Sequence, residues 1–162
     1  MFQQNDIITY AELGFFQNMH GLPMNAFRSC HSLTKIDLQY LTSFGRFSIY
    51  DIRVQQLIFE EGVTSFPDIC FGGAMVVKYA DLPSSVTSIG NSNINNFASG
   101  SVLVCRATTP PTLGRGNTAA SKIYVPAASV AAYKAASNWS AQAGKIMQIE
   151  GTWYETHRSL EP

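Results

Sequence analysis

The sequence predicts an α+β repeat solenoid of about four to five coils, each 21–24 residues long, with short parallel strands stacked on one another. Two patterns carry this prediction, because a five-residue signature and an apolar triplet both recur at the same interval. The length supports it, since 162 residues with 46% hydrophobic content suffice for one packed domain. We expect a helical cap at the amino-terminal end and a strand followed by a helix as the cap at the other end.

The signature consists of an apolar residue, Thr-Ser, a larger apolar residue, and Gly or Pro. Its copies occupy 41–45, 63–67, 86–90 and, more weakly, 110–114. Their larger apolar residues lie 22, 23 and 24 residues apart, and a period in the twenties is typical of solenoids. The apolar positions Val63, Phe66, Val86 and Ile89 are expected to point inward. Gly45 and Gly90 are expected to permit the chain reversal that follows.

An apolar triplet lies ahead of each signature, and its last two members are two positions apart. The triplets begin at Leu33, Val54 and Val77, which are separated by 21 and 23 residues. Alternate residues of a strand point to opposite faces, so Ile36, Leu57 and Ala80 are predicted to stack inside the coil on neighbouring parallel strands. One coil cannot bury its own apolar face, and stacking removes that face from water.

A column of aromatic residues is predicted deeper in each coil. Phe27 and Phe71 lie 44 residues apart and are expected to share this column. The intervening copy has Ser48 in the same register, so Phe47 or Ile49 is expected to fill the position after a slip of one residue. The polar run 91–97 is the expected irregular loop.

We expect the chain to be divided into an N-terminal cap (1–24), the repeats (25–114), a C-terminal capping module (115–151) and a tail (152–162). Thr9 and Glu12 fit a capping box, which predicts a short helix that lays Leu13 and Phe16 over the first coil.

The capping module is predicted from residues 122–146. A last strand over 122–126 is followed by an alanine-rich helical pattern over 127–137, with Pro126 where the strand stops and the helix begins. Trp139 and Ile146 are expected to close the stack. The tail has no periodic pattern, so we expect it to be loosely held or to dock elsewhere.

Residues 26–36 and 82–90 resemble the repeat of the BspA-like leucine-rich repeat proteins of gut and oral bacteria. Residues 109–114 and 122–140 resemble the closing C-terminal module of that family, and the resemblance covers roughly 7–151. The second repeat and the loop after Gly90 depart from it, because they lack the Ala-Phe-x-x-Cys phrase. The resemblance implies a secreted or surface-displayed protein for adhesion and protein contact, with no catalytic residues to carry over.

Location stays open between two alternatives. The family resemblance implies an extracellular or cell-surface protein, although residues 1–6 lack the basic start and apolar run of a signal peptide. Related sequences also occur in mobile elements and phages of such bacteria, so the alternative is a virion.

The residue types that carry chemistry are scattered, so we expect no enzyme, no cofactor and no metal site. The three histidines stand alone, and no G-x-S-x-G motif is present. Cys30, Cys70 and Cys105 are expected to be buried thiols; Cys30 and Cys70 would lie roughly 10 Å apart, too far for a disulfide. Lys plus Arg and Asp plus Glu number 11 each, which disfavours nucleic acid, and no apolar run approaches a membrane span.

The remaining candidate for function is the outward face of the strands. The same offsets of 21 and 23 place its residues in two columns, Lys35, Gln56 and Tyr79 beside Asp37, Ile58 and Asp81. We predict these six as binding residues for a protein or glycan partner. The competing interpretation is an ordinary exposed sheet.

Two functional hypotheses follow. The first is a non-enzymatic interaction or adhesion module of a bacterial surface or secreted protein. The second is a structural subunit of a larger assembly such as a phage particle. In that case the apolar N-terminal segment and the tail would be contact arms, and homo-oligomer contacts would be formed.

Overall fold

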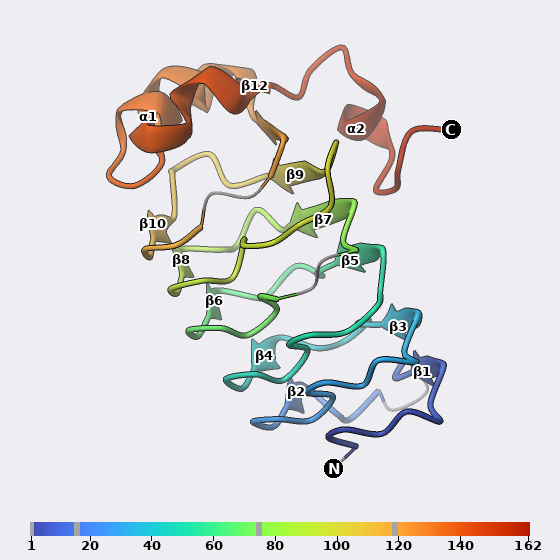
Figure 1. Cartoon of the computed structure of the whole chain (residues 1–162). Coiled ribbons are helices and arrows are strands. Elements are labelled where there is room, and N and C mark those ends of the chain that lie inside the picture. Colours follow the sequence, from blue (N-terminus) through green and yellow to red (C-terminus); the bar gives the residue numbers. More distant parts are fainter. Residues whose placement is uncertain (1, 15–16, 74–75, 118–119) are drawn as a thin grey trace.

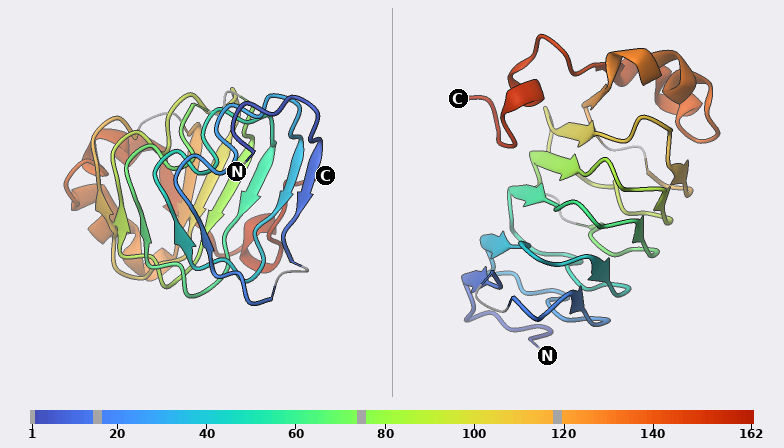
Figure 2. Two further views of the ribbon diagram at one scale, coloured as in Figure 1. Left: turned by 90° about the horizontal axis from the view of Figure 1, so that it is seen from below. Right: turned by 180° about the vertical axis from the view of Figure 1, so that it is seen from behind.

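Short strands alternate between two sides of a stack of coils (Figure 1). The computed structural model describes residues 2–14, 17–73, 76–117 and 120–162. The first side carries β1 (Tyr10–Glu12), β3 (Lys35–Asp37), β5 (Gln56–Ile58), β7 (Tyr79–Leu82), β9 (Val102–Cys105) and β11 (Lys122–Val125). The second side carries β2 (Gly21–Leu22), β4 (Ser43–Phe44), β6 (Ser65–Phe66), β8 (Ser88–Ile89) and β10 (Thr112–Leu113). Viewed along the stack, the first-side strands follow one another in a row (Figure 2).

Neighbouring strands on the first side are paired in parallel with the register that the repeat predicts. Leu57 lies opposite Ala80, and Ala80 lies opposite Leu103. These three residues are completely buried, because their side chains alternate toward the interior. The repeat solenoid with stacked parallel strands is therefore confirmed.

The second side also follows the prediction, with one correction to its glycines. Val63, Phe66, Val86 and Ile89 are all buried. The glycine after β10, Gly114, has no left-handed φ; a Cβ there would lie 2.5 Å from the backbone nitrogen of Asn91 in the preceding coil. Gly45 and Gly90 occupy the same register and approach the preceding coil as closely, so the three glycines form a column. This glycine column is required by the close approach of successive coils, and not by the chain reversal expected of Gly45 and Gly90.

A third wall, built from irregular backbone at 24–30, 46–52, 68–73, 91–95 and 115–117, closes each coil. Phe27 and Phe71 are buried there as predicted, and Ile49 is the residue that fills the intervening position. Phe47 instead lies half-buried, with the guanidinium groups of Arg28 and Arg46 over its ring.

The expected irregular loop at 91–97 has an ordered core made by asparagines. Asn93 is fully buried, and its Oδ1 accepts hydrogen bonds from the backbone nitrogens of Cys70 and Phe71. One coil further on, Oδ1 of Asn117 accepts from the nitrogens of Asn93 and Ile94. Each amide thus replaces a backbone carbonyl of the ladder, so buried N–H groups find acceptors where the backbone is irregular.

Both sheets break at the same level, between the coil of β3 and β4 and the coil of β5 and β6. The ladder on the first side runs β12-β11-β9-β7-β5 and separately β1-β3, and on the second side β10-β8-β6 and separately β2-β4. On the second side Gly45 and Gly90 each donate a backbone hydrogen bond to the preceding coil, whereas Pro67 at the same register has no N–H. The third wall remains continuous there, since Phe47 and Ile49 donate to carbonyls of the next coil. We call this level the seam.

The seam corrects one predicted alignment. Ile36 is paired with Ala11, and among the described residues no strand ladder joins it to Leu57. The interior is filled here by a cluster of phenylalanine rings, in which Phe59 contacts Phe44, Phe66 and Phe71 with ring centroids 4.6–5.3 Å apart. The core therefore remains filled at the level where the strand ladders are interrupted.

The predicted N-terminal helix is wrong. Tyr10–Glu12 forms β1, which pairs in parallel with β3, so the segment expected to be a helical cap belongs to the repeating stack. Leu13 is buried, and Phe16 lies outside the described residues. The local capping-box pattern is overridden because pairing with β3 buries Ala11 and satisfies the backbone.

The predicted C-terminal strand and helix are present as β11, a 3₁₀ turn over Ala127–Ser129 and α1 (Val130–Ala135). Trp139 and Ile146 are buried at this end, as expected. The sequence interpretation missed β12 (Ile146–Gln148), which pairs in parallel with β11 and adds a rung.

Candidate functional site

The outward columns of the first side consist of two different halves, a lower half on β3 and β5 and an upper half on β7. Lys35 and Gln56 are exposed, and Asp37 and Ile58 are half-buried. Tyr79 and Asp81, in contrast, are 0% exposed although they point away from the core. The six predicted residues therefore do not form one open surface.

The upper half is covered by the chain's own C-terminal tail. The last helix, α2 (Trp153–Thr156), lies beside β9, and the segment that follows it runs down toward β7 in two opposite views (Figures 1 and 2). The Tyr154 ring stacks on the Tyr79 ring with centroids 5.6 Å apart and also contacts Tyr124 at 5.1 Å. The prediction that Tyr79 and Asp81 are open binding positions is thus wrong, because the tail buries them.

Asp81 is the electrostatic centre of the covered half. Arg106 donates two hydrogen bonds to its carboxylate, at 2.9 and 2.8 Å, and the Tyr79 hydroxyl donates a third at 2.7 Å. Nε of Arg158 in the tail lies 3.4 Å from the same carboxylate. A carboxylate removed from water requires such partners, and the two guanidinium groups supply them.

These contacts shift the proton affinities of the partners. Burial, and then the neighbouring Asp81 carboxylate, raises the pKa of Tyr79 far above its ordinary value. Burial opposes the charge of Arg106, but its hydrogen bonds to Asp81 outweigh that effect and raise its pKa. At neutral pH Tyr79 is therefore a neutral phenol, and Arg106 carries its positive charge.

Further contacts fix the tail along the face. Arg158 donates to the Phe59 carbonyl and, at 3.2 Å, to the Glu60 carboxylate. The backbone nitrogen of Leu160 donates to Oε1 of Gln56 at 3.2 Å, and the Tyr154 carbonyl accepts from Arg106 at 3.0 Å. The tail thus spans from β9 to β5 and ends beside the seam.

The sequence of β9 indicates that both faces of this strand are covered. Its residues Val102, Leu103, Val104 and Cys105 form an uninterrupted apolar run, and all four are buried. A strand covered on one face only alternates apolar with polar residues, whereas a continuous run indicates cover on both faces. The second cover is provided by a small outer cluster in which Tyr79, Val102, Val104, Ile149 and Tyr154 pack together.

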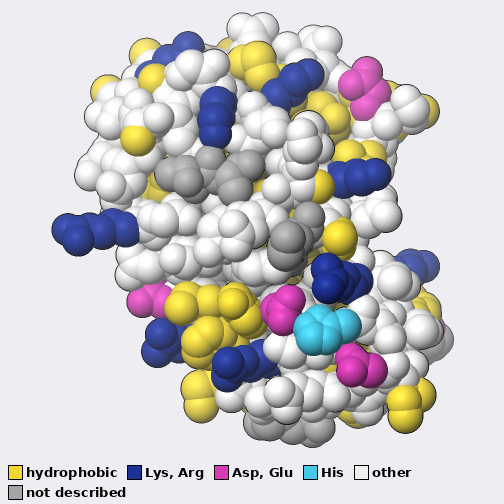
Figure 3. Space-filling view, viewed as in Figure 1, with side chains coloured by type: hydrophobic (Ala, Val, Ile, Leu, Met, Phe, Trp, Pro, Cys, Tyr) yellow, Lys and Arg dark blue, Asp and Glu magenta, His cyan; other side chains and the backbone are white. Residues whose placement is uncertain are grey.

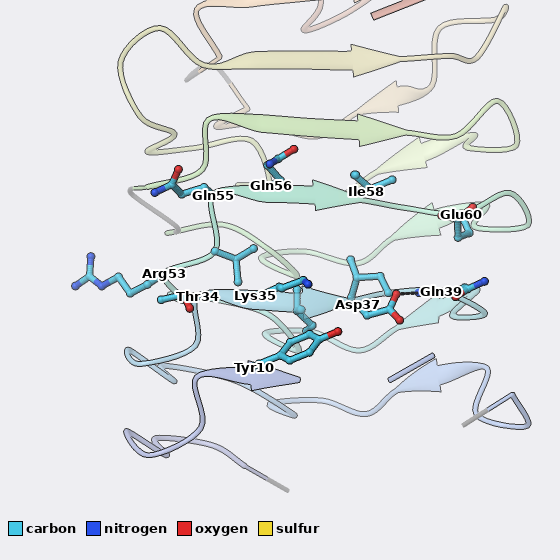
Figure 4. Close-up of a pocket in the computed structure, with 13 residues that line it drawn as sticks. Tyr10, Thr34, Lys35, Asp37, Gln39, Arg53, Gln55, Gln56, Ile58 and Glu60 are labelled. Carbon is cyan, nitrogen blue, oxygen red and sulfur yellow. Dashed lines mark hydrogen bonds between the residues drawn. The ribbon is translucent and has the colours of Figure 1, made fainter. Parts of the chain in front are cut away.

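The lower half of the face is an open groove of about 640 Å³ at the seam (Figure 4). Its walls are β3 and β5, with Tyr10 of β1 below. The groove forms here because the strand ladder is interrupted between β3 and β5. Four of the predicted binding residues line it, namely Lys35, Asp37, Gln56 and Ile58.

Both ends of the groove are polar, and the two ends carry opposite charges. Lys35 and Arg53 lie toward the beginning of the strands, and Asp37 and Glu60 lie toward their ends (Figure 4). The Lys35 ammonium lies 4.7 Å from the centroid of the Tyr10 ring, a cation–π contact. The side-chain amides of residues 39, 55 and 56 add hydrogen-bond donors and acceptors along the groove.

The cysteine and histidine side chains lie outside this groove. The three cysteines are buried free thiols, as predicted, and burial raises the pKa of Cys70 to about 12 and that of Cys105 to about 11. His31 connects coils, with Nε2 3.0 Å from Asp51 and Nδ1 3.7 Å from Asp6. The residues described by the structure hold no cluster of three or more His, Cys, Asp or Glu that could bind a metal ion.

A family model described as "BspA type Leucine rich repeat region" matches residues 2–109 in six copies. No curated protein matches the chain. Among the described residues, helices with the length and apolar character needed to cross a membrane are absent.

Proposed function

Because the chain belongs to the BspA-type leucine-rich repeat family, a scaffold commonly used for protein interaction, we propose that it is a non-enzymatic module that binds an extended segment of a partner protein in the seam groove. Lys35, Asp37, Gln56 and Ile58 are the groove residues from the predicted set, joined by Arg53 and Glu60.

The observation that carries this proposal is the break in the strand ladder beside an open, polar groove. β5 is paired only with β7 in its sheet, so its other edge faces the groove. An unpaired strand edge presents backbone donors and acceptors to which an extended peptide can hydrogen bond. Ile58 offers apolar contact, and the opposite charges at the two ends would fix the direction of a bound segment.

A surface on which positive and negative charges balance is suited to selective contacts of this kind. Lys plus Arg equals Asp plus Glu over the whole chain, and the face shown in Figure 3 has acidic and basic side chains interspersed. Binding is therefore expected to depend on the local charges of the groove, and only weakly on the overall field of the molecule.

We place this module outside a bacterial cell, in a surface-displayed or secreted adhesive protein, in keeping with the family resemblance. In the alternative hypothesis the chain is a subunit of a larger assembly, and the tail is one of its contact arms. That alternative has less support, because the tail is docked on the chain's own strands.

Selection from a random twelve-residue peptide display library on the full chain tests the groove. Selected peptides are expected to lose at least tenfold in affinity for K35E and for D37K, because each reverses a charge at one end of the groove. The control is K122E, which makes the same charge change at an exposed position of β11 in the Lys35 column, outside the groove. Equal binding to all four proteins would contradict the proposal, and a glycan array probed with the same variants tests whether sugars bind there instead.

A further inference from the structure

The covered half of the strand face has the chemistry of a binding surface. Beneath the tail lie Tyr79 and Tyr124, the valines of β9, and the carboxylates of Asp81 and Glu60. Aromatic side chains grouped around a buried charged pair are typical of the residues that dominate the energy of protein interfaces.

The tail contacts this surface as a peptide ligand would. It is a short segment with one helical turn, and three side chains make its main contacts. Tyr154 stacks on Tyr79, Arg158 reaches Asp81 and Glu60, and Leu160 packs against the outer cluster. Spaced four and two residues apart, they form the pattern of an aromatic residue, an arginine and an aliphatic residue.

Release of the tail would not leave Asp81 without a partner. Arg106 donates two hydrogen bonds to that carboxylate, and the Tyr79 hydroxyl donates another. The usual penalty for separating a buried charge from its only partner therefore does not hold the tail in place. Tyr79 and the valines of β9 would instead become an exposed apolar patch around an acidic centre, which is the kind of surface that marks interaction sites.

We infer that the strand face of β5, β7 and β9 is a second binding surface, for a partner segment with an arginine four residues after an aromatic residue, and that the tail is the competing ligand carried within the same chain. The partner's aromatic ring replaces Tyr154 on Tyr79, and its guanidinium replaces that of Arg158 beside Asp81 and Glu60. Gln56 and Glu60 also line the seam groove, but no step of this inference requires a ligand in that groove.

Competition sets how strongly such a partner binds. The tail is tethered, so its effective concentration at the surface is in the millimolar range, and a free peptide must displace it. A substitution that weakens tail docking should therefore strengthen binding of a free peptide. An integral structural segment would show no such reciprocity.

The experiment uses a fluorescent synthetic peptide of residues 152–162 and the full-length chain. R158E reverses the charge of the tail at Asp81, and its control is K134E, the same change on the exposed face of α1. Fluorescence anisotropy is expected to show the peptide binding R158E at least tenfold more tightly than the wild-type chain or K134E. A peptide with Ala in place of the arginine is expected to lose at least tenfold of that affinity.

Three results would overturn the inference. The first is a folded R158E chain that binds the peptide no better than K134E. The second is binding that does not depend on the peptide's arginine. The third is a wild-type dimer held by exchanged tails and lost in R158E, because it would make the occupant a second copy.

Hydrogen exchange of the wild-type chain tests the inference even if R158E fails to fold. The backbone amides of His157 and Leu160 should exchange at least a hundredfold faster than those of β7. Equal protection would make the tail part of the fold and would overturn the inference.

Discussion

Arg158 and Asp81 lie far apart in the chain, yet Nε of the arginine is 3.4 Å from the carboxylate, on the outer face of the strands. This pairing divides the strand face into a half that the tail covers and a half that is open at the seam. The two halves carry the two binding surfaces proposed above.

Removing the Asp81 carboxylate should destabilise the protein strongly. D81A leaves the partly buried guanidinium of Arg106 without its two hydrogen bonds, and breaking a buried pair in this way costs about 3 kcal/mol. E12A, in the same outward column on β1 but exposed, should cost about 0.5 kcal/mol or less. Urea unfolding of both variants measures the difference, and similar midpoints would contradict the burial of Asp81.

The buried amides of Asn93 and Asn117 accept backbone hydrogen bonds between the coils of the third wall, and we call them the asparagine ladder. Removing an amide from this ladder should also lower the stability of the protein. N93A leaves the buried backbone nitrogens of Cys70 and Phe71 without their acceptor, which predicts a loss of about 3 kcal/mol in the free energy of unfolding. N95A removes one acceptor, for the nitrogen of Gly73, from a half-buried position and should cost about 1 kcal/mol. Chemical denaturation in parallel gives both values, and equal losses would argue against the ladder.

The repeat pattern predicted the register and most of the core because both depend on one period. The offset of 23 residues placed Leu57 opposite Ala80, and the structure has this pairing. The seam could not be predicted in this way, since the period of the sequence continues across the level at which both ladders are interrupted. Pro67 removes one ladder N–H there without changing the period.

The two features that the sequence did not reveal, the strand at the N-terminal end and the place where the tail docks, concern segments whose structure is set by distant partners. The residues from Thr9 to Glu12 fit the pattern of a helix start. In the structure Tyr10–Glu12 instead forms β1, which pairs with β3. The tail has no periodicity, and α2 is only four residues long, so its position depends on Tyr79 and Asp81 and not on its own propensity. Gln56 and Tyr79, and likewise Ile58 and Asp81, were placed in the correct columns, but a column position does not reveal what covers it.

The glycine column tests how closely successive coils approach. In G114A the new Cβ would lie 2.5 Å from the backbone nitrogen of Asn91 and 2.6 Å from the carbonyl carbon of Gly90, so backbone must move. We expect a loss of about 3 kcal/mol or more, as for overpacking against rigid structure. G144A meets no atom within 4 Å and should be neutral or slightly stabilising. Thermal unfolding distinguishes them, and a tolerated G114A would mean that the coils are more loosely stacked.

Acid should destabilise the stack through two carboxylates that bridge coils. Hydrogen bonds from the backbone and side chain of Asn91 lower the pKa of Asp68. Burial opposes the charge of Glu61, but hydrogen bonds from Ser84 and Ser85 outweigh it and lower its pKa. A lowered folded-state pKa gives stability that is present above the unfolded values of 3.8 and 4.5 and is lost as the pH falls through the lower folded values.

The urea midpoint is therefore expected to fall between about pH 5 and pH 3. The fall should be smaller in the D68N/E61Q double variant, because neither substituted side chain titrates. An unchanged pH dependence in that variant would show that other groups control acid unfolding.

The central claim is that the tail lies on the outer strand face and separates a covered half from the open groove. Nuclear Overhauser effects between ring protons test it most directly, because the Tyr79 and Tyr154 rings stack with centroids 5.6 Å apart. We predict cross-peaks between these two rings, together with shifts of the Val102 and Val104 methyl resonances caused by the neighbouring aromatic rings. Random-coil shifts for residues 152–162 and no contact between the two rings would contradict the account.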